Sequence, residues 1–133
     1  SVMKPNKKYN LLFIFTDQQR HDTLPVYGNR KIKTPNLDNL AKGSAVFKKA
    51  YVSQPVCTPS RASIITGLYP HAHGLVKNNI CLSEDKPSVA KIVKKAGYKT
   101  AYMGKWHLGN EVIPQHGFDK WVSVEDNYWR HYS

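Results

Sequence analysis

The sequence has few cysteines, few acidic residues and no long apolar run. Two cysteines among 133 residues exclude a disulfide-rich scaffold. The longest apolar run, Leu11 to Phe15, has five residues, whereas a membrane-spanning helix needs about 20. The same run is too short for the apolar region of a signal peptide. The sequence therefore predicts neither a membrane span nor a signal peptide in this chain.

The scarcity of acidic residues leaves a strong positive charge. Nine Asp and Glu stand against 20 Lys and Arg, which gives a formal net charge of +11. Nucleic-acid binders carry such charge in patches, but here the lysines are scattered and no run reaches five like charges. We therefore favour a solvated basic surface and predict no nucleic-acid partner. Attraction of an anionic substrate and contact with an acidic surface outside this chain are the other interpretations.

The apolar content predicts a folded chain. Hydrophobic residues make up 41% of the sequence and aromatic residues 11%, so a disordered chain is excluded. The length fits one domain. The run Leu11 to Phe15 predicts a strand buried on both faces. Ala45 to Val52 predicts a second strand, and Lys99 to Met103 a third.

Three helices are predicted between the first and the last of these strands. The first covers residues 34–43, with Thr34 as its N-cap and Gly43 at its end. The second begins near Pro59 or Ser60 and ends at Gly67. The third runs from Ser88 to Gly97, and its predicted apolar face consists of Val89, Ile92, Val93 and Ala96. The alternation of strands and helices predicts an α/β fold with a mainly parallel sheet flanked by helices.

Polar residues directly follow two of the predicted strands. Asp17 and Gln18 come after Leu11 to Phe15, and residues 104–107 come after Lys99 to Met103. In parallel sheets, ligands bind beyond the carboxyl ends of the strands. The sequence therefore predicts that both polar groups lie at one edge of the sheet.

The sharpest pattern is the segment Cys57-Thr58-Pro59-Ser60-Arg61. Backbone N–H groups at a helix start favour an anion, so a cysteine there is a candidate thiolate nucleophile. Arg61 follows one turn later and offers a planar fork for an oxyanion. A thiol nucleophile or an anion pocket is therefore predicted. The alternative for a lone cysteine is a small buried side chain beside a turn.

This pentapeptide resembles the signature of the type I sulfatases, in which a maturation enzyme oxidises the cysteine to formylglycine. Further segments resemble the same family in order and spacing, from about Asn10 to Asp119: residues 10–20, 34–41, 61–71, 104–109 (Gly-Lys-Trp-His-Leu-Gly) and 117–119. The chain is thereby identified as a member of the alkaline phosphatase-like superfamily. The resemblance implies that residues 1–133 are the amino-terminal part of a sulfatase catalytic domain.

The resemblance makes Cys57, as formylglycine, the nucleophile of a sulfuric ester hydrolase. A hydrated aldehyde carries two hydroxyls on one carbon. One hydroxyl attacks sulfur and expels the alcohol, and the other then loses its proton and expels sulfate, which regenerates the aldehyde. A thiolate would instead leave a stable covalent adduct. We therefore predict little or no turnover while Cys57 is unmodified.

The resemblance also implies a divalent cation held by Asp17, Gln18 and the residue derived from Cys57. Oxygen donors suit Ca²⁺, with Mg²⁺ as the alternative. Such an ion would ease ionisation of the hydrate and hold a sulfate oxygen. Gln18 stands where many family members carry a second Asp, so this set has one negative charge fewer. Without the motif, Asp17 would be interpreted as a helix cap or turn residue.

Three basic residues receive catalytic roles from the resemblance. Arg61 would contact the hydrate and the carboxylates beside the metal, and Lys105 would offset charge on the sulfate oxygens. His107 would hydrogen-bond the hydrate and assist proton transfer. Without the motif, the interpretations would be a surface ion pair, a solvated lysine and a structural histidine.

The remaining histidines, cysteine and aromatics have simpler interpretations. His71 and His73, with Cys57 or Cys81, could be read as zinc ligands, but we prefer a role in shaping their loop. Cys81 is expected to be buried, without a disulfide to Cys57. Three aromatic residues are expected in the core rather than stacked on a sugar: Trp121, Tyr128 and Trp129.

The family's catalytic unit is longer than this chain, because further metal ligands and a catalytic lysine and histidine lie downstream. We therefore expect the 133 residues alone to be inactive. The substrate implied for the full-length parent is a sulfated sugar or an aryl sulfate, and the location is periplasmic, secreted or lysosomal. A related phosphonate or phosphate monoester hydrolase, or a noncatalytic fragment that binds polyanions, are the alternative functions.

Overall fold

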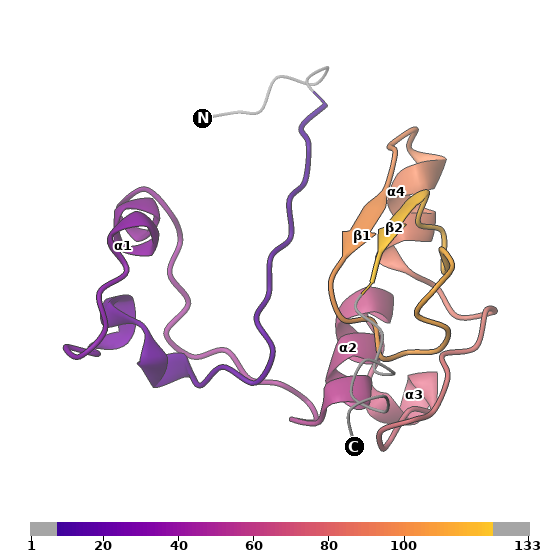
Figure 1. Cartoon of the computed structure of the whole chain (residues 1–133), viewed down its shortest axis with the longest axis horizontal. Coiled ribbons are helices and arrows are strands. Elements are labelled where there is room, and N and C mark those ends of the chain that lie inside the picture. The colour runs from indigo at the N-terminus through magenta and orange to yellow at the C-terminus, as the bar shows by residue number, and fades with distance from the viewer. Residues whose placement is uncertain (1–7, 124–133) are drawn as a thin grey trace. The chain divides into compact units, whose positions relative to one another are not determined.

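The computed structural model describes residues 8–123 of the chain (Figure 1). Contacts divide the chain into two units, Ser1–Lys48 (unit 1) and Lys49–Ser133 (unit 2). Two of the site residues expected from the sequence, Asp17 and Gln18, belong to unit 1. The others, from Cys57 onward, belong to unit 2.

Unit 1 contains two short 3-10 helices, η1 (His21–Thr23) and η2 (Pro25–Tyr27), and one α-helix, α1 (Pro35–Lys42). The bounds of α1 confirm the prediction for residues 34–43. The Thr34 hydroxyl does not cap the backbone and instead donates to Asp38 Oδ1 at 3.1 Å. None of residues 8–48 is buried.

Two predicted strands do not form. Residues 11–15 and 45–52 contain no strand, and the side chains of Leu11, Leu12, Phe13 and Ile14 are 62–82% exposed. Both predictions were wrong for the described chain because a strand exists only when a neighbour takes up its backbone N–H and C=O groups. Apolar side chains favour burial of a segment, but they do not provide the neighbouring strand with which its backbone would form hydrogen bonds.

Three helices belong to unit 2: α2 (Cys57–Thr66), α3 (Pro70–His73) and α4 (Val89–Lys95). Helix α2 starts two residues earlier than the nearest predicted start, because Pro59 is tolerated within a first turn, where its missing N–H needs no partner. It ends as predicted at Gly67, whose φ of +71° closes the helix with an N–H bond to Ser63 O at 2.9 Å.

Helix α4 confirms the predicted cap and corrects the predicted face. The Ser88 hydroxyl oxygen accepts the Lys91 N–H at 3.1 Å, as an N-cap should. However, Ala90 is the buried residue of this helix, while Val89 and Ile92 are 39% and 61% exposed. The buried Ser88 side chain also donates to the His116 carbonyl, which orients the first turn so that Ala90 faces inward.

Two short parallel strands, β1 (Ala101–Met103) and β2 (Lys120–Val122), form the sheet of unit 2. β1 confirms the strand predicted over Lys99 to Met103, and Tyr102 pairs with Trp121 across the ladder. Three residues are too few for β2 to show a pattern in the sequence. The connection between the strands, residues 104–119, contains no helix.

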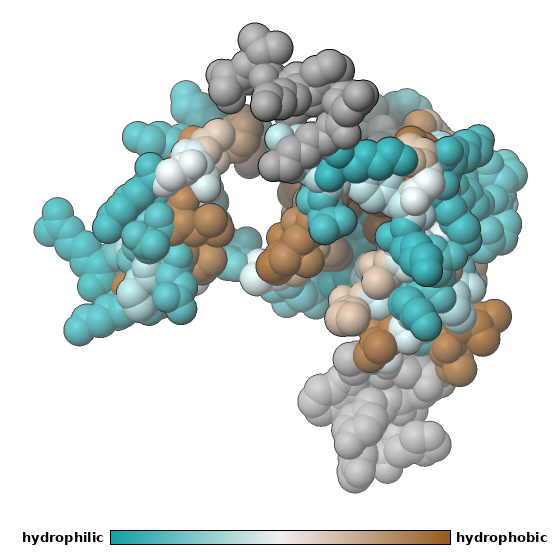
Figure 2. All heavy atoms as spheres, turned by 90° about the horizontal axis from the view of Figure 1, so that it is seen from above, coloured by the Kyte–Doolittle hydropathy of each residue, from teal (hydrophilic) through white to brown (hydrophobic). Residues whose placement is uncertain are grey.

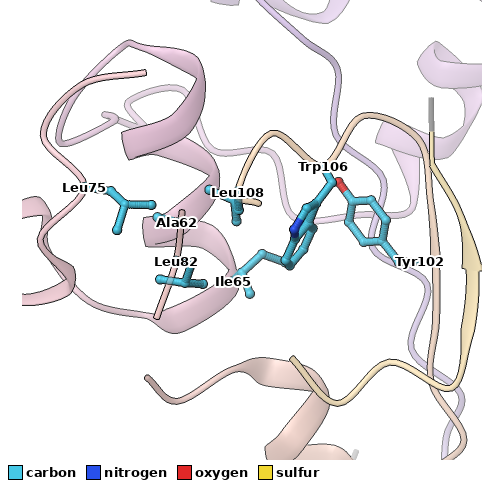
Figure 3. Packing of buried hydrophobic residues seen from close by; sticks show 7 residues of the cluster. All are labelled: Ala62, Ile65, Leu75, Leu82, Tyr102, Trp106 and Leu108. Carbon is cyan, nitrogen blue, oxygen red and sulfur yellow. The ribbon is translucent and has the colours of Figure 1, made fainter. Parts of the chain in front are cut away.

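The core of unit 2 joins α2 to this sheet (Figure 3). Figure 3 shows Trp106 between the aliphatic side chains beside α2 and the ring of Tyr102. The Trp106 ring lies 5.0 Å from that of Tyr102 and 5.1 Å from that of Trp121. Edge-to-face pairs of this kind contribute about 0.5–1.5 kcal/mol each beyond burial. The seven cluster residues are Ala62, Ile65, Leu75, Leu82, Tyr102, Trp106 and Leu108.

Trp121 packs against this cluster, as expected for a core aromatic. The expectations for Tyr128 and Trp129 lie outside the described residues. Many apolar side chains elsewhere remain on the surface, where Figure 2 shows them as brown patches. Phe47, Tyr51 and Met103 are each more than 70% exposed. Within residues 8–123, no helix is long and apolar enough to cross a membrane.

Candidate functional site

The first residue of α2 is Cys57, which is partly buried and carries a free thiol. The ammonium of Lys105 lies 3.8 Å from its sulfur. Cys57 belongs to α2 and Lys105 follows β1, and both elements are labelled in Figure 1. Lys105 follows β1 directly, after a turn at Gly104 with a φ of +115°. The fold thus brings together two motif residues that are 48 positions apart in sequence.

Arg61, one helical turn after Cys57, is buried and directed at the loop that carries Lys105. Its Nη1 donates to the carbonyl oxygen of Lys105, and the hydroxyl of Tyr102 donates to the same oxygen. Burial raises the pKa of Tyr102, so its hydroxyl stays a neutral donor. One arm of the Arg61 guanidinium therefore fixes the backbone of Lys105, a role that the sequence did not predict.

The first turn of α2 is tied to the same loop through Thr58. The Thr58 hydroxyl, which is fully buried, donates to the carbonyl oxygen of His107 at 2.9 Å. The Thr58 N–H donates to Asn78 Oδ1 at 2.9 Å. Since the first N–H groups of a helix have no partner inside it, Asn78 acts as a cap supplied from a distant loop. These bonds hold Cys57 and His107 on adjoining segments.

His107 adopts a backbone conformation that is uncommon for a residue with a side chain. Its φ is +57°, and the left-handed region costs a non-glycine residue on the order of 1–2 kcal/mol. The ring Nε2 lies 3.2 Å from Asn79 Oδ1, a residue that is also left-handed, with a φ of +64°. The position of the imidazole is therefore set by the backbone of residue 107 and by Asn79.

A carboxylate farther along the same loop supports this conformation. Glu111 accepts the N–H of Trp106 at 3.1 Å and that of His107 at 2.5 Å, one on each oxygen. The hydroxyl of Ser123 donates to Oε2 of the same group. Hydrogen bonds to a charged acceptor contribute about 1.5–3 kcal/mol each. The two N–H bonds are therefore sufficient to offset the cost of the left-handed residue.

The two histidines interpreted as alternative zinc ligands are used differently. His73 is buried: its Nδ1 accepts the Leu75 N–H at 3.0 Å, and its Nε2 lies 3.1 Å from Ser63 Oγ. Burial lowers the pKa of His73. His71 is exposed and stacks on Tyr69 at 5.9 Å. Among residues 8–123, no group of three or more His, Cys, Asp or Glu side chains gathers as a metal site.

The predicted metal ligands of unit 1 are oxygen donors in consecutive positions. Asp17 and Gln18 are both exposed and follow the apolar run, and Gln18 has a φ of +54°. A carboxylate and an amide oxygen fit the hard-cation chemistry of Ca²⁺, which takes six to eight oxygen ligands. These two residues, which both belong to unit 1, can supply only part of such a set.

Several residues that build the site have no recognisable signal in the sequence. Asn78 and Asn79 look like ordinary loop residues, and Glu111 looks like a solvated acid. Only the spacing of the surrounding motifs could have drawn attention to them. Cys81 corrects a further expectation, because it is exposed rather than buried, although both cysteines are free as expected.

Comparison with known proteins identifies the family. The family profile described as Sulfatase matches residues 9–133. An ulvan-active sulfatase of Formosa agariphila is 42% identical over 89% of this chain, and an N-acetylglucosamine-6-O-sulfatase of Bacteroides thetaiotaomicron is 38% identical over 86%. The chain spans 24% and 20% of the length of these relatives.

Solved structures agree on the fold. The yidJ protein of Bacteroides fragilis superposes with a TM-score of 0.79 at 30% identity, over 93% of this chain and 34% of that one. A phosphonate monoester hydrolase of Agrobacterium radiobacter gives 0.71 at 24% identity, over 87% of this chain and 27% of that one, which shows a shared fold alone. These matches confirm the predicted alkaline phosphatase-like α/β fold. The chain belongs to the sulfatase family.

Proposed function

We propose that the protein containing this chain hydrolyses sulfate esters and that unit 2 supplies its nucleophile. The observation that carries the proposal is the 3.8 Å approach of Lys105 Nζ to Cys57 Sγ at the start of α2. A cation beside the nucleophilic atom can stabilise the charge that develops on sulfate oxygens during attack. The names of the relatives, which are sulfatases, support the same reaction.

In this proposal Cys57 is matured to formylglycine, whose hydrate supplies the attacking hydroxyl and the later release of sulfate. Lys105 holds the sulfate by charge, and His107 exchanges a proton with the hydrate from its position beside Asn79. Arg61 keeps Lys105 in place through its backbone carbonyl. A maturation enzyme that reads the segment from Cys57 to Arg61 is the implied partner.

We further propose that Asp17 and Gln18 contribute oxygen ligands to a divalent cation, with Ca²⁺ preferred over Mg²⁺ for this donor type. Such a cation would supply positive charge for the hydrolysis of the sulfate ester. Removal of metal by a chelator should abolish turnover, and Ca²⁺ should restore it. Asp17→Asn should raise the Ca²⁺ concentration needed for half-maximal activity.

A sulfated sugar is the proposed class of substrate. One relative is named for N-acetylglucosamine-6-O-sulfate and another for ulvan, and the basic balance of +11 would attract an anionic glycan. By the same family argument, the protein works in a periplasmic, secreted or lysosomal location.

The decisive experiment uses the full-length protein from its native source. Peptide mapping should show Cys57 with sulfur replaced by oxygen and two hydrogens lost. The matured protein should cleave 4-nitrophenyl sulfate much faster than 4-nitrophenyl phosphate or a phenyl phosphonate. Faster phosphonate cleavage would favour the alternative hydrolase. Salt-sensitive binding of a sulfated polysaccharide, with no cleavage and an unmodified Cys57, would favour a noncatalytic role.

A further inference from the structure

Several backbone groups of the loop after β1 are hydrogen-bonded, and one side chain accepts two of its N–H groups. The Gly104 N–H donates to Val122 O at 2.8 Å, and the carbonyls of Lys105 and His107 are taken by Arg61 and Thr58. The N–H groups of residues 106 and 107 both donate to Glu111. The Glu111 carboxylate is therefore the acceptor on which the middle of the loop depends.

The surroundings of Glu111 indicate that this carboxylate is kept for the loop rather than for an ion pair. Within residues 8–123, no Lys or Arg side chain pairs with it, and its oxygens are occupied by two N–H groups and the Ser123 hydroxyl. Consecutive N–H groups that point the same way form an anion-binding concavity. In this chain the anion that fills the concavity is the chain's own carboxylate.

Glu111 also connects the loop to the second strand. Its backbone carbonyl accepts the Trp121 Nε1–H at 2.7 Å, and Trp121 belongs to β2 and packs on the core. Ser123, which binds the carboxylate, follows β2 directly. Any displacement of the loop would therefore break contacts with β2 as well as the two N–H bonds. The loop is anchored from both sides.

We propose that Glu111 is a positioning residue that holds Lys105 and His107 in their working geometry without touching substrate. The inference rests on the proposed function for the roles of those two residues. Glu111 imposes the left-handed conformation at His107 and fixes the direction in which residues 105–107 leave β1. A displacement of about 1 Å at a reacting group can cost on the order of a hundredfold in rate.

The test is Glu111→Gln in the full-length, matured protein. The amide keeps the size of the side chain, but it has one acceptor oxygen, so its NH₂ group would face one of the two loop N–H groups. We expect kcat on 4-nitrophenyl sulfate to fall about 10–100-fold, with KM changed less than about threefold. Amide exchange of Trp106 and His107 should speed up about tenfold or more, while exchange in α2 stays unchanged.

Two further variants keep the test interpretable. Asp85→Asn removes the same charge from an exposed turn and should leave both kcat and loop exchange unchanged. Glu111→Asp keeps the charge but retracts it by one methylene, so its kcat should lie between those of the wild type and Glu111→Gln. If Glu111→Gln does not fold, Glu111→Asp takes its place, with a smaller change in the same direction expected in both readouts.

A change in kcat without a change in amide exchange, or the reverse, overturns the proposal. Faster loop exchange with unchanged kcat would show that turnover does not need the loop geometry, and a lower kcat with unchanged exchange would show that Glu111 acts by another route. A wild-type protein that cleaves no sulfate ester would refute the proposed function. In that case amide exchange alone would still decide whether Glu111 holds the loop.

Discussion

Each of the two units contains a helix that the sequence predicted, but the two helices differ in how much of their surface is buried. Helix α1 in unit 1 has eight residues within the predicted range, none is buried, and the Thr34 hydroxyl does not cap it. Helix α2 in unit 2 has ten residues, of which six are buried. Local signals thus suffice to form a helix in both units. Helix α2 contributes to a core, and hydrogen bonds from Thr58 and Arg61 tie it to the loop that carries Lys105 and His107.

The largest expected effect concerns the nucleophile in unit 2. Cys57→Ala should abolish sulfate ester hydrolysis, lowering kcat by at least about a thousandfold, because no other described group can replace a covalent nucleophile. The matched control is Cys81→Ala, which removes the exposed cysteine and should leave kcat within about twofold. Assays of both full-length variants on 4-nitrophenyl sulfate make the comparison. Comparable loss in the two variants would refute the assignment of Cys57.

The second prediction contrasts the two units in stability. Leu108→Ala removes a fully buried side chain and should lower the free energy of unfolding by about 2–5 kcal/mol. Leu40→Ala in α1, where the side chain is 65% exposed, should cost less than about 1 kcal/mol. Denaturant unfolding of the full-length variants measures both. An equal loss at Leu40 would contradict the contrast in stability between the two helices.

The third prediction tests the bond between α2 and the loop after β1. Thr58→Val keeps the shape of the side chain but leaves the His107 carbonyl without its donor, so we expect kcat to fall about tenfold and stability to fall by about 1–3 kcal/mol. Thr23→Val removes a hydroxyl that donates to Arg20 O in an exposed, local hydrogen bond of unit 1, and it should change neither by a measurable amount. If Thr58→Val keeps full activity, the link between the motifs is structural only.

The smallest expected effect is a pH dependence of stability. Burial lowers the pKa of His73, and protonation of its Nδ1 would break the bond from the Leu75 N–H. The unfolded state therefore binds more protons as the pH falls below about 6.5, and stability should decrease from pH 7.5 to pH 5. His73→Gln should reduce that slope, whereas His71→Gln, at an exposed ring, should not.

Part of this slope should persist in His73→Gln. Burial also lowers the pKa of His116. The charge of Lys91 lowers this pKa further, whereas the charge of Glu84 raises it. The measurement is the thermal midpoint of the full-length variants across that pH range. A slope that is identical in the wild type and His73→Gln would show that His73 is not the group that titrates.

The resemblance predicted the family and the fold class, and local signals predicted α1, α2, α4 and β1. Of the finer details, the Ser88 cap and the end of α2 at Gly67 are confirmed, whereas the Thr34 cap and the apolar face of α4 were wrong. Two strands predicted from apolar composition failed, since strand formation depends on a partner for the backbone. Cys57, Lys105 and His107 were selected as site residues from sequence, and their roles stay proposals. Glu111, Asn78 and Asn79 could not be selected, because their contacts join segments that are distant or irregular.

The sequence by itself determined which residues are candidates for the chemistry of the site. They are a cysteine at a helix start, a lysine and a histidine after a strand, and oxygen donors after an apolar run. It did so because those residue types and spacings have few other uses. Tertiary structure alone decided which of them meet. The approach of Lys105 to Cys57, and the left-handed His107 with its Glu111 support, depend on how α2, β1 and β2 pack around Trp106.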